Sequence, residues 1–113
     1  MCKLRVLMTN EPRSYRETIA LALEAARPQA HVIVAEPGAL DPEVRRLSPR
    51  LVICSRATAL VEAQVPVWLE LYSEHGPDST VSFAGQRSTV KGMELEDLIR
   101  IFDLTIDFAL DAV

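Results

Sequence analysis

The chain has 113 residues and a formal net charge of -4 at pH 7, with 49% hydrophobic and 25% charged residues. This length predicts one domain with a single core over residues 1–113. The negative charge and the scattered arginines argue against a nucleic-acid partner, because a phosphate-binding surface needs clustered Lys and Arg. No apolar stretch approaches the ~20 residues of a membrane span, so we expect no membrane partner and a cytoplasmic location.

The first half of the chain alternates short apolar runs with helical patterns. Residues 4–8 form an apolar run typical of a strand buried on both faces of a parallel sheet. A helix should follow, capped by Ser14, with Tyr15 and Ile19 at helical spacing and a stop at Pro28. Further strands are expected at residues 31–35, 51–54 and 65–71, and short helices between Asp41 and Pro49 and at residues 58–63. Strands that alternate with helices predict a parallel sheet.

The alternation of strand and helix patterns ends after residue 72. Turn residues cluster at 75–78, and two short strand patterns at residues 80–84 and 88–90 are separated by a turn at 85–87. This segment is too short and too rich in turn residues for a full helix. It predicts a β-meander in place of a fourth helix.

The last helix is expected from about Glu94 to about Asp111. Its main apolar stripe should pack on the sheet and contains Leu95, Leu98, Ile99, Phe102, Ile106, Ala109 and Leu110. Ile101, Leu104 and Phe108 form a second apolar strip that a helix packed once against a sheet does not need. We interpret this strip as an interface, with burial beneath the meander or simple exposure as the alternatives.

Three segments are informative beyond their apolar pattern: Thr9-Asn10-Glu11-Pro12, Pro49 to Ser55, and Thr89 to Leu98. Together they resemble segments of the response-regulator receiver family. Thr9-Asn10-Glu11-Pro12 lies where receivers carry the acidic pair that holds magnesium. Ser55 lies six residues after Pro49, at the place of the phosphorylated aspartate. Lys91 matches the phosphate-contacting lysine, although Gly92 replaces the usual proline. The resemblance implies a flavodoxin-like α/β sandwich of three layers, with a central parallel sheet in the order 2-1-3-4-5.

The residues at these matched positions do not suit phosphotransfer. Magnesium prefers carboxylate ligands, and Thr9 with Asn10 offers none, leaving Glu11 as the one nearby carboxylate. Ser55 cannot form an acyl phosphate, and as a nucleophile it would need an adjacent base. Cys54 lies in an apolar run and is expected to be an inert hydrophobe rather than a reactive thiol. We therefore expect no catalytic residues, no metal and no cofactor.

Together these observations predict a pseudo-receiver: a non-enzymatic, phosphorylation-independent module in signalling or regulation that contacts a second copy or a signalling protein. The alternative is a sensor of a small ligand or anion, because Thr9, Asn10, Ser55 and Lys91 should converge where the parallel strands end. A plainer interpretation also stands. Asn10 and Ser55 would then cap helices or satisfy loop backbone groups, and Lys91 would pair with Glu11.

Overall fold

The computed structural model describes residues 4–11, 13–71 and 78–111. Within them, the sheet contains β1 (Leu4–Met8), β2 (Ala30–Val34), β3 (Leu51–Cys54), β4 (Val67–Glu70), β5 (Ser79–Phe83) and β6 (Gln86–Val90). The helices are α1 (Arg13–Ala26), the 3-10 turn η1 (Pro37–Ala39), α2 (Leu40–Leu47), α3 (Ala59–Gln64) and α4 (Leu95–Asp111). The predicted bounds of the first and third strands are confirmed.

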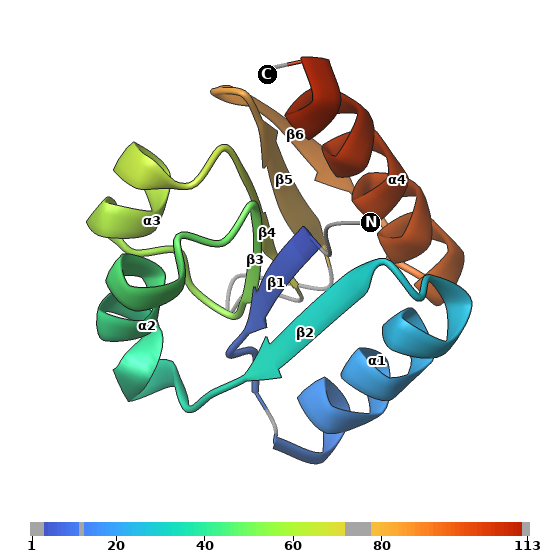
Figure 1. Ribbon diagram of the computed structural model, residues 1–113, viewed down its shortest axis with the longest axis horizontal. Coiled ribbons are helices and arrows are strands. Elements are labelled where there is room, and N and C mark those ends of the chain that lie inside the picture. The colour runs from blue at the N-terminus through green and yellow to red at the C-terminus, as the bar shows by residue number, and fades with distance from the viewer. Residues whose placement is uncertain (1–3, 12, 72–77, 112–113) are drawn as a thin grey trace.

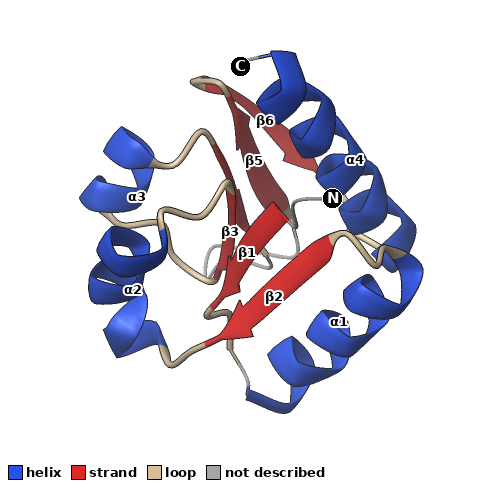
Figure 2. Cartoon of the chain, viewed as in Figure 1, coloured by secondary structure: helices blue, strands red, loops and turns tan. Residues whose placement is uncertain are grey.

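Helices cover both faces of the sheet (Figures 1 and 2). Helices α1 and α4 lie on one face, and η1, α2 and α3 lie on the other. The strand pleat sends neighbouring residues to opposite faces, so Val6 joins the core beneath α1 and α4 while Leu7 joins the core beneath α2 and α3. Trp68 is 3% exposed and belongs to the second of these cores. The chain therefore folds as an α/β structure with two apolar layers around one sheet.

The sheet differs from the expected one in order and direction. Its order is β2-β1-β3-β4-β5-β6, and β5 pairs antiparallel with both β4 and β6. A parallel crossover needs about 12 or more residues, and the connection from Glu70 to Ser79 is shorter. The expected central parallel sheet is found for β2, β1, β3 and β4. The expected β-meander supplies β5 and β6, so the sheet is mixed and β6 extends it beyond the predicted order 2-1-3-4-5.

A tight hairpin replaces the expected turn at residues 85–87. Ala84 and Gly85 both have positive φ, 53° and 88°, and they connect β5 directly to β6. Positive φ at both central positions is typical of the turns that match the twist of a hairpin. The sixth strand consequently begins at Gln86, two residues earlier than the sequence predicts.

Two helices also begin earlier than expected. Ser14 lies inside α1, and Asp41 lies inside α2. The helix α3 starts one residue later than predicted, because Thr58 is its N-cap and accepts a hydrogen bond through its side chain from the backbone N–H of Val61 at 3.2 Å.

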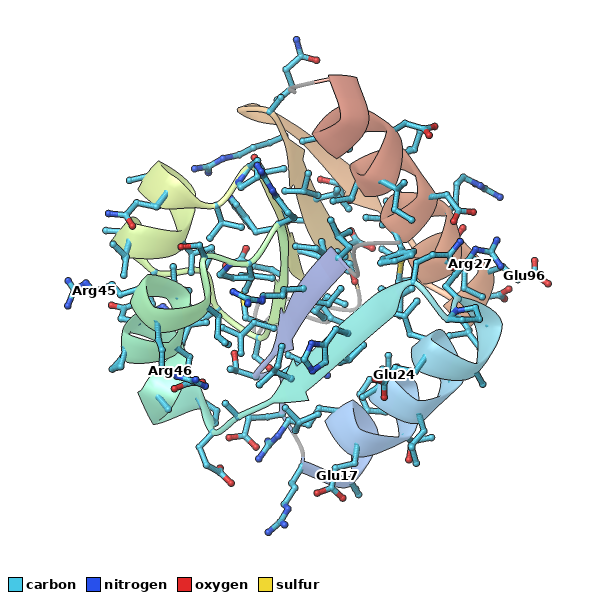
Figure 3. All side chains as sticks on the ribbon, viewed as in Figure 1. Glu17, Glu24, Arg27, Arg45, Arg46 and Glu96 are labelled. Atoms are coloured by element: carbon cyan, nitrogen blue, oxygen red, sulfur yellow. The ribbon has the colours of Figure 1, made fainter. Side chains whose placement is uncertain are left out.

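The helix α4 is rotated relative to its predicted orientation. Its buried residues are Leu98, Ile101, Phe102 and Thr105, whereas Leu95 is 42% exposed. Thr105 tolerates burial because its hydroxyl donates to the carbonyl of Ile101 at 2.7 Å. Arg27 at the end of α1 (Figure 3) contacts Asp103 of α4 through Nε and Nη2, at 2.7 and 2.8 Å. In the described part of the chain, no helix has the length and apolar character needed to cross a membrane.

Candidate functional site

The polar residues after β1 and β3 meet at the carboxyl edge of the sheet. The chain leaves β1 toward β2 on one side, while β3 pairs with β1 on the other side. Such a reversal of strand order is where open α/β sheets commonly bind ligands. Thr9 donates its backbone N–H to the carbonyl of Ile53 at 2.9 Å, which holds the ends of these two strands together.

Ser55 connects the loops that follow these strands. Its Oγ accepts a hydrogen bond from the backbone N–H of Glu11 at 2.7 Å. This contact agrees with the plainer interpretation of Ser55, in which its hydroxyl satisfies a loop backbone group. The residue at the phosphoacceptor position thus has a structural partner in the loop after β1.

Arg16 is the site residue that the sequence analysis missed. Its side chain is 1% exposed and lies in the first turns of α1. The guanidinium lies 3.0 Å from a Glu36 carboxylate oxygen and 3.6 Å from one of Glu11, and it donates to the carbonyl of Asn10 at 3.4 Å. The sequence does carry one indication that Arg16 is buried, because Arg16 lies on the same helical stripe as Ile19, Ala20 and Leu23.

Several buried polar atoms around Arg16 have no hydrogen-bond partner among the described residues. They are Thr9 Oγ1, both side-chain polar atoms of Asn10 and Nε of Arg16. Thr9 and Asn10 are 1% and 0% exposed. Most buried polar groups in proteins are paired. Asn10 therefore does not cap a helix through its side chain, contrary to the plainer interpretation, and the carboxyl end of β1 is an unusual polar cluster.

A cavity of about 480 Å³ opens beside this cluster. The polar part of its lining comes from Thr9, Glu11, Ser55, Arg56 and Thr58. The apolar part includes Pro37, Leu40 and Cys54. Arg56 has no acidic partner among the described residues, so its positive charge is available at this cavity.

Cys54 is a poor nucleophile in this setting. Burial raises the pKa of its thiol to about 12, and the nearby carboxylate of Glu70 acts in the same direction. Its Sγ lies 3.6 Å from the carbonyl of Leu69. Glu70 itself accepts from the backbone N–H of Ala57 at 2.8 Å. A thiol that stays protonated at neutral pH supports the prediction that Cys54 is a small buried hydrophobe.

Lys91 does not join this cluster. It follows β6, and β4 and β5 lie between that strand and β3. Neighbouring strands are about 4.8 Å apart, which places the end of β6 roughly 14 Å from the end of β3. The expected convergence of Lys91 with Thr9, Asn10 and Ser55 is therefore wrong, and Glu11 instead lies beside Arg16.

The predicted interface on α4 is only partly exposed. Ile101 is 9% exposed and belongs to the core beneath α1 and α4, so its assignment to an outer strip is wrong. Leu104 is 49% exposed. The side chain of Phe108 lies outside the described part of the structure. The rotation of α4 buries Ile101 and leaves Leu104 exposed, these being the two residues of the strip whose side chains the structure describes.

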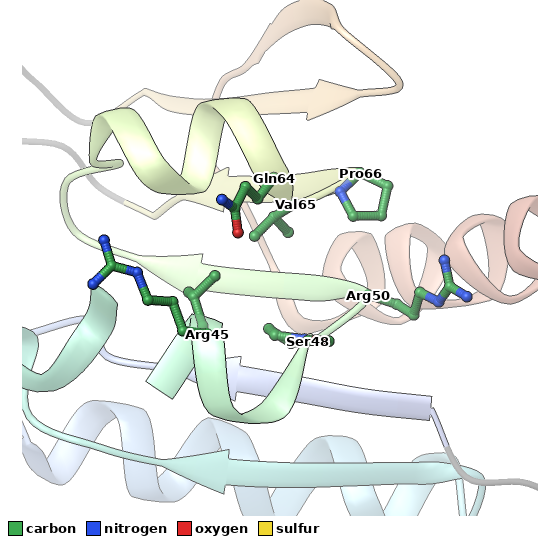
Figure 4. Close-up of a pocket in the computed structure, with 8 residues that line it drawn as sticks. Arg45, Ser48, Arg50, Gln64, Val65 and Pro66 are labelled. Carbon is green, nitrogen blue, oxygen red and sulfur yellow. The ribbon is translucent and has the colours of Figure 1, made fainter. Parts of the chain in front are cut away.

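A second cavity, of about 270 Å³, lies at the opposite edge of the sheet between the ends of α2 and α3 (Figure 4). Its lining includes Arg45, Ser48, Arg50 and Gln64. Figure 4 shows the Arg45 and Arg50 side chains pointing away from each other. Since the two cations do not converge, this cavity is a weaker candidate than the one at the carboxyl edge.

No protein-family model, curated protein or solved structure matches the chain. Across the described residues, no group of three or more His, Cys, Asp or Glu side chains is placed to hold a metal ion. The local chemistry agrees, because the carboxylate of Glu11 faces the Arg16 guanidinium. A cation bound by Glu11 would be repelled by that positive charge.

Proposed function

We propose that this chain is a non-enzymatic interaction module on a receiver-like, flavodoxin-like scaffold. It acts in signalling or regulation without phosphorylation and contacts a second copy or a signalling protein. The observation that carries this proposal is the position of Arg16. A buried guanidinium held by Glu11 and Glu36 supplies a permanent positive charge at the strand end where the receiver resemblance would place a metal ion.

A permanent internal cation changes what the scaffold can do. A metal-dependent switch gains and loses charge at this position, whereas the Arg16 guanidinium is covalently part of the chain and is held there by Glu11 and Glu36. Ser55, at the acceptor position, already binds the backbone of Glu11. Both contacts support a fixed carboxyl edge, and the function is then carried by the outer surface.

The exposed flank of α4 supplies a candidate contact surface. Asp103 binds Arg27 of α1, and Leu104 lies about 100° further around the helix. Leu104 therefore lies on the flank turned away from α1. A half-exposed leucine on that flank is available to a partner.

The variant Leu104→Asp tests this surface. We expect it to lower the molar mass of the protein, measured by light scattering after gel filtration, from that of a dimer to that of the 12.5 kDa chain. Leu21→Asp is the matched control, because Leu21 is 71% exposed on the outer side of α1 and should leave the mass unchanged. A dimer that persists in Leu104→Asp would contradict the role of the α4 flank.

The environment of the Thr9 hydroxyl favours a second function, the sensing of a small ligand or anion. Its hydroxyl is buried, unpartnered among the described residues and part of the carboxyl-edge cavity, where Arg56 provides a positive charge. Inorganic phosphate is the simplest probe. Saturable amide NMR shifts at Thr9, Ser55 and Arg56 that disappear in Arg56→Ala would support this function, and unchanged spectra would argue against it.

A further inference from the structure

The last strand of the sheet has a free edge. β6 pairs with β5 on one side, and no strand in the described part of the chain lies on its other side. Its first four residues, Gln86 to Thr89, are all exposed. Natural proteins usually protect such edges, because unpaired backbone groups can pair with another chain.

The hairpin register determines which backbone groups point outward. The pair flanking a two-residue turn is hydrogen-bonded, and hydrogen-bonded pairs then alternate along the strands. Here Phe83 and Gln86 flank the turn, and Val81 and Ser88 form the next hydrogen-bonded pair. Arg87 and Thr89 therefore direct their backbone N–H and C=O groups toward the free edge.

The charged side chain on this strand does not block the edge. Arg87 turns back across the sheet, where its guanidinium lies 5.3 Å from the centre of the Trp68 ring and forms an ion pair with Glu62 of α3. Trp68 of β4 and Glu62 of α3 both lie on the side of β6 that faces β5, away from the free edge. The guanidinium is thus held away from the position that an added strand would occupy.

We propose that β6 pairs antiparallel with β6 of a second copy, about a two-fold axis through Ser88. This register places Arg87 opposite Thr89 of the second copy, so the outward-facing residues of both strands meet as hydrogen-bonded pairs. Centring the pair on Arg87 instead would place two like charges opposite each other, which is unfavourable. The Ser88 register is therefore self-complementary and joins the two sheets into one continuous sheet.

The α4 surface is compatible with this arrangement. Ser88 lies opposite Val81, which belongs to the core beneath α1 and α4, so Ser88 faces the α4 side of the sheet. Helix α1 packs against β2 at the other end of the sheet. The flank of α4 that carries Leu104 consequently faces the β6 side, and the two α4 helices would lie on the same face near the axis. This inference rests on the proposed function and names its partner and its surface.

A charge exchange at Ser88 tests the register directly. Because Ser88 lies opposite itself, Ser88→Asp and Ser88→Lys should each raise the dimer dissociation constant about tenfold, measured by sedimentation equilibrium. An equimolar mixture should restore the dimer, since Asp then lies opposite Lys. Circular dichroism of each variant checks that the fold is retained, and a purely structural defect would not be rescued by mixing.

Two outcomes would overturn the strand pairing. The first is a wild-type chain that stays at 12.5 kDa across the micromolar range, and the second is a dimer indifferent to charge at residue 88. If that dimer still dissociates in Leu104→Asp, the strand pairing is wrong while the proposed function stands. If the wild type is monomeric, the strand pairing is wrong, and the proposed function is tested by adding magnesium and a phosphoryl analogue to the protein. Unchanged amide signals at the carboxyl edge would support that function, and shifted signals would contradict it.

Discussion

Arg16 combines full burial with two exposed acidic partners. The side chains of Glu11 and Glu36 are 59% and 68% exposed, so water can solvate both carboxylates if the guanidinium is removed. A buried ion pair is often no more stable than an apolar side chain of similar size. The charge of Arg16 is therefore better explained by a role in fixing the carboxyl edge than by a contribution to stability.

Arg16→Met should change the free energy of unfolding by less than about 1 kcal/mol, because Met fills a similar volume without a charge. Glu36→Gln should instead lower it by about 1–2 kcal/mol, because the buried guanidinium loses its nearer charged partner. Urea unfolding measures both variants. A loss of several kcal/mol in Arg16→Met alone would show that the ion pairs stabilise the fold.

Some residue positions could be predicted and others could not. Thr9 and Ser55 follow apolar strands that are buried on both faces, so their meeting at the carboxyl edge follows from the pattern. The predicted position of Lys91 beside these residues is wrong because an extra antiparallel strand separates Lys91 from β3. Arg16 was missed because a single arginine on an apolar stripe usually extends its charge to solvent.

At the scale of elements, α1 and α4 are joined by a forked ion pair. Arg27 holds the pKa of Asp103 below its ordinary value, mainly through the hydrogen bonds between the two side chains. A carboxyl group with a lowered folded-state pKa stabilises the protein above its unfolded-state pKa of about 3.9. That contribution is lost as the pH falls through the folded-state value.

The pair therefore predicts a pH dependence of stability. At neutral pH, Asp103→Asn should unfold at a lower urea concentration than the wild type, and the difference should shrink as the pH falls below about 4. The effect should be small because both side chains are partly exposed. Asp107→Asn is the control, as Asp107 lies one turn further along the exposed side of α4. A difference that grows toward acid pH would contradict this assignment.

The elements were predictable where the apolar pattern of a segment and the length of its connections point to the same structure. β3 is apolar and buried along its whole length, and β1 is apolar except for Arg5 and buried from Val6 to Met8, which marks both strands in the sequence. The direction of β5 is not encoded in its apolar pattern, and only the short connection before it excludes a parallel crossover. The rotation of α4 depends on packing against α1, and no periodicity along a single helix reports that contact.

At the scale of the whole molecule, one face of the sheet is covered unevenly. Helices α2 and α3 cover β1, β3 and β4, while Thr80, Ser82 and Thr89 fall on the same face of the β5–β6 hairpin. A polar face suits this hairpin, since none of the described helices covers it on that side. The polar residues of the β5–β6 hairpin thus fit its place where the sequence predicted a β-meander instead of a helix. The ion pair between Arg87 and Glu62 links this hairpin to α3.

A carboxyl edge fixed by the contacts of Arg16 and Ser55 should not respond to phosphoryl chemistry. The most direct measurement is an amide NMR titration of the labelled protein, first with magnesium and then with beryllofluoride. The amide signals of Thr9, Asn10 and Ser55 should stay in place through both additions. Saturable shifts of these signals with magnesium, enlarged by beryllofluoride, would contradict it and would show that the scaffold still works as a switch.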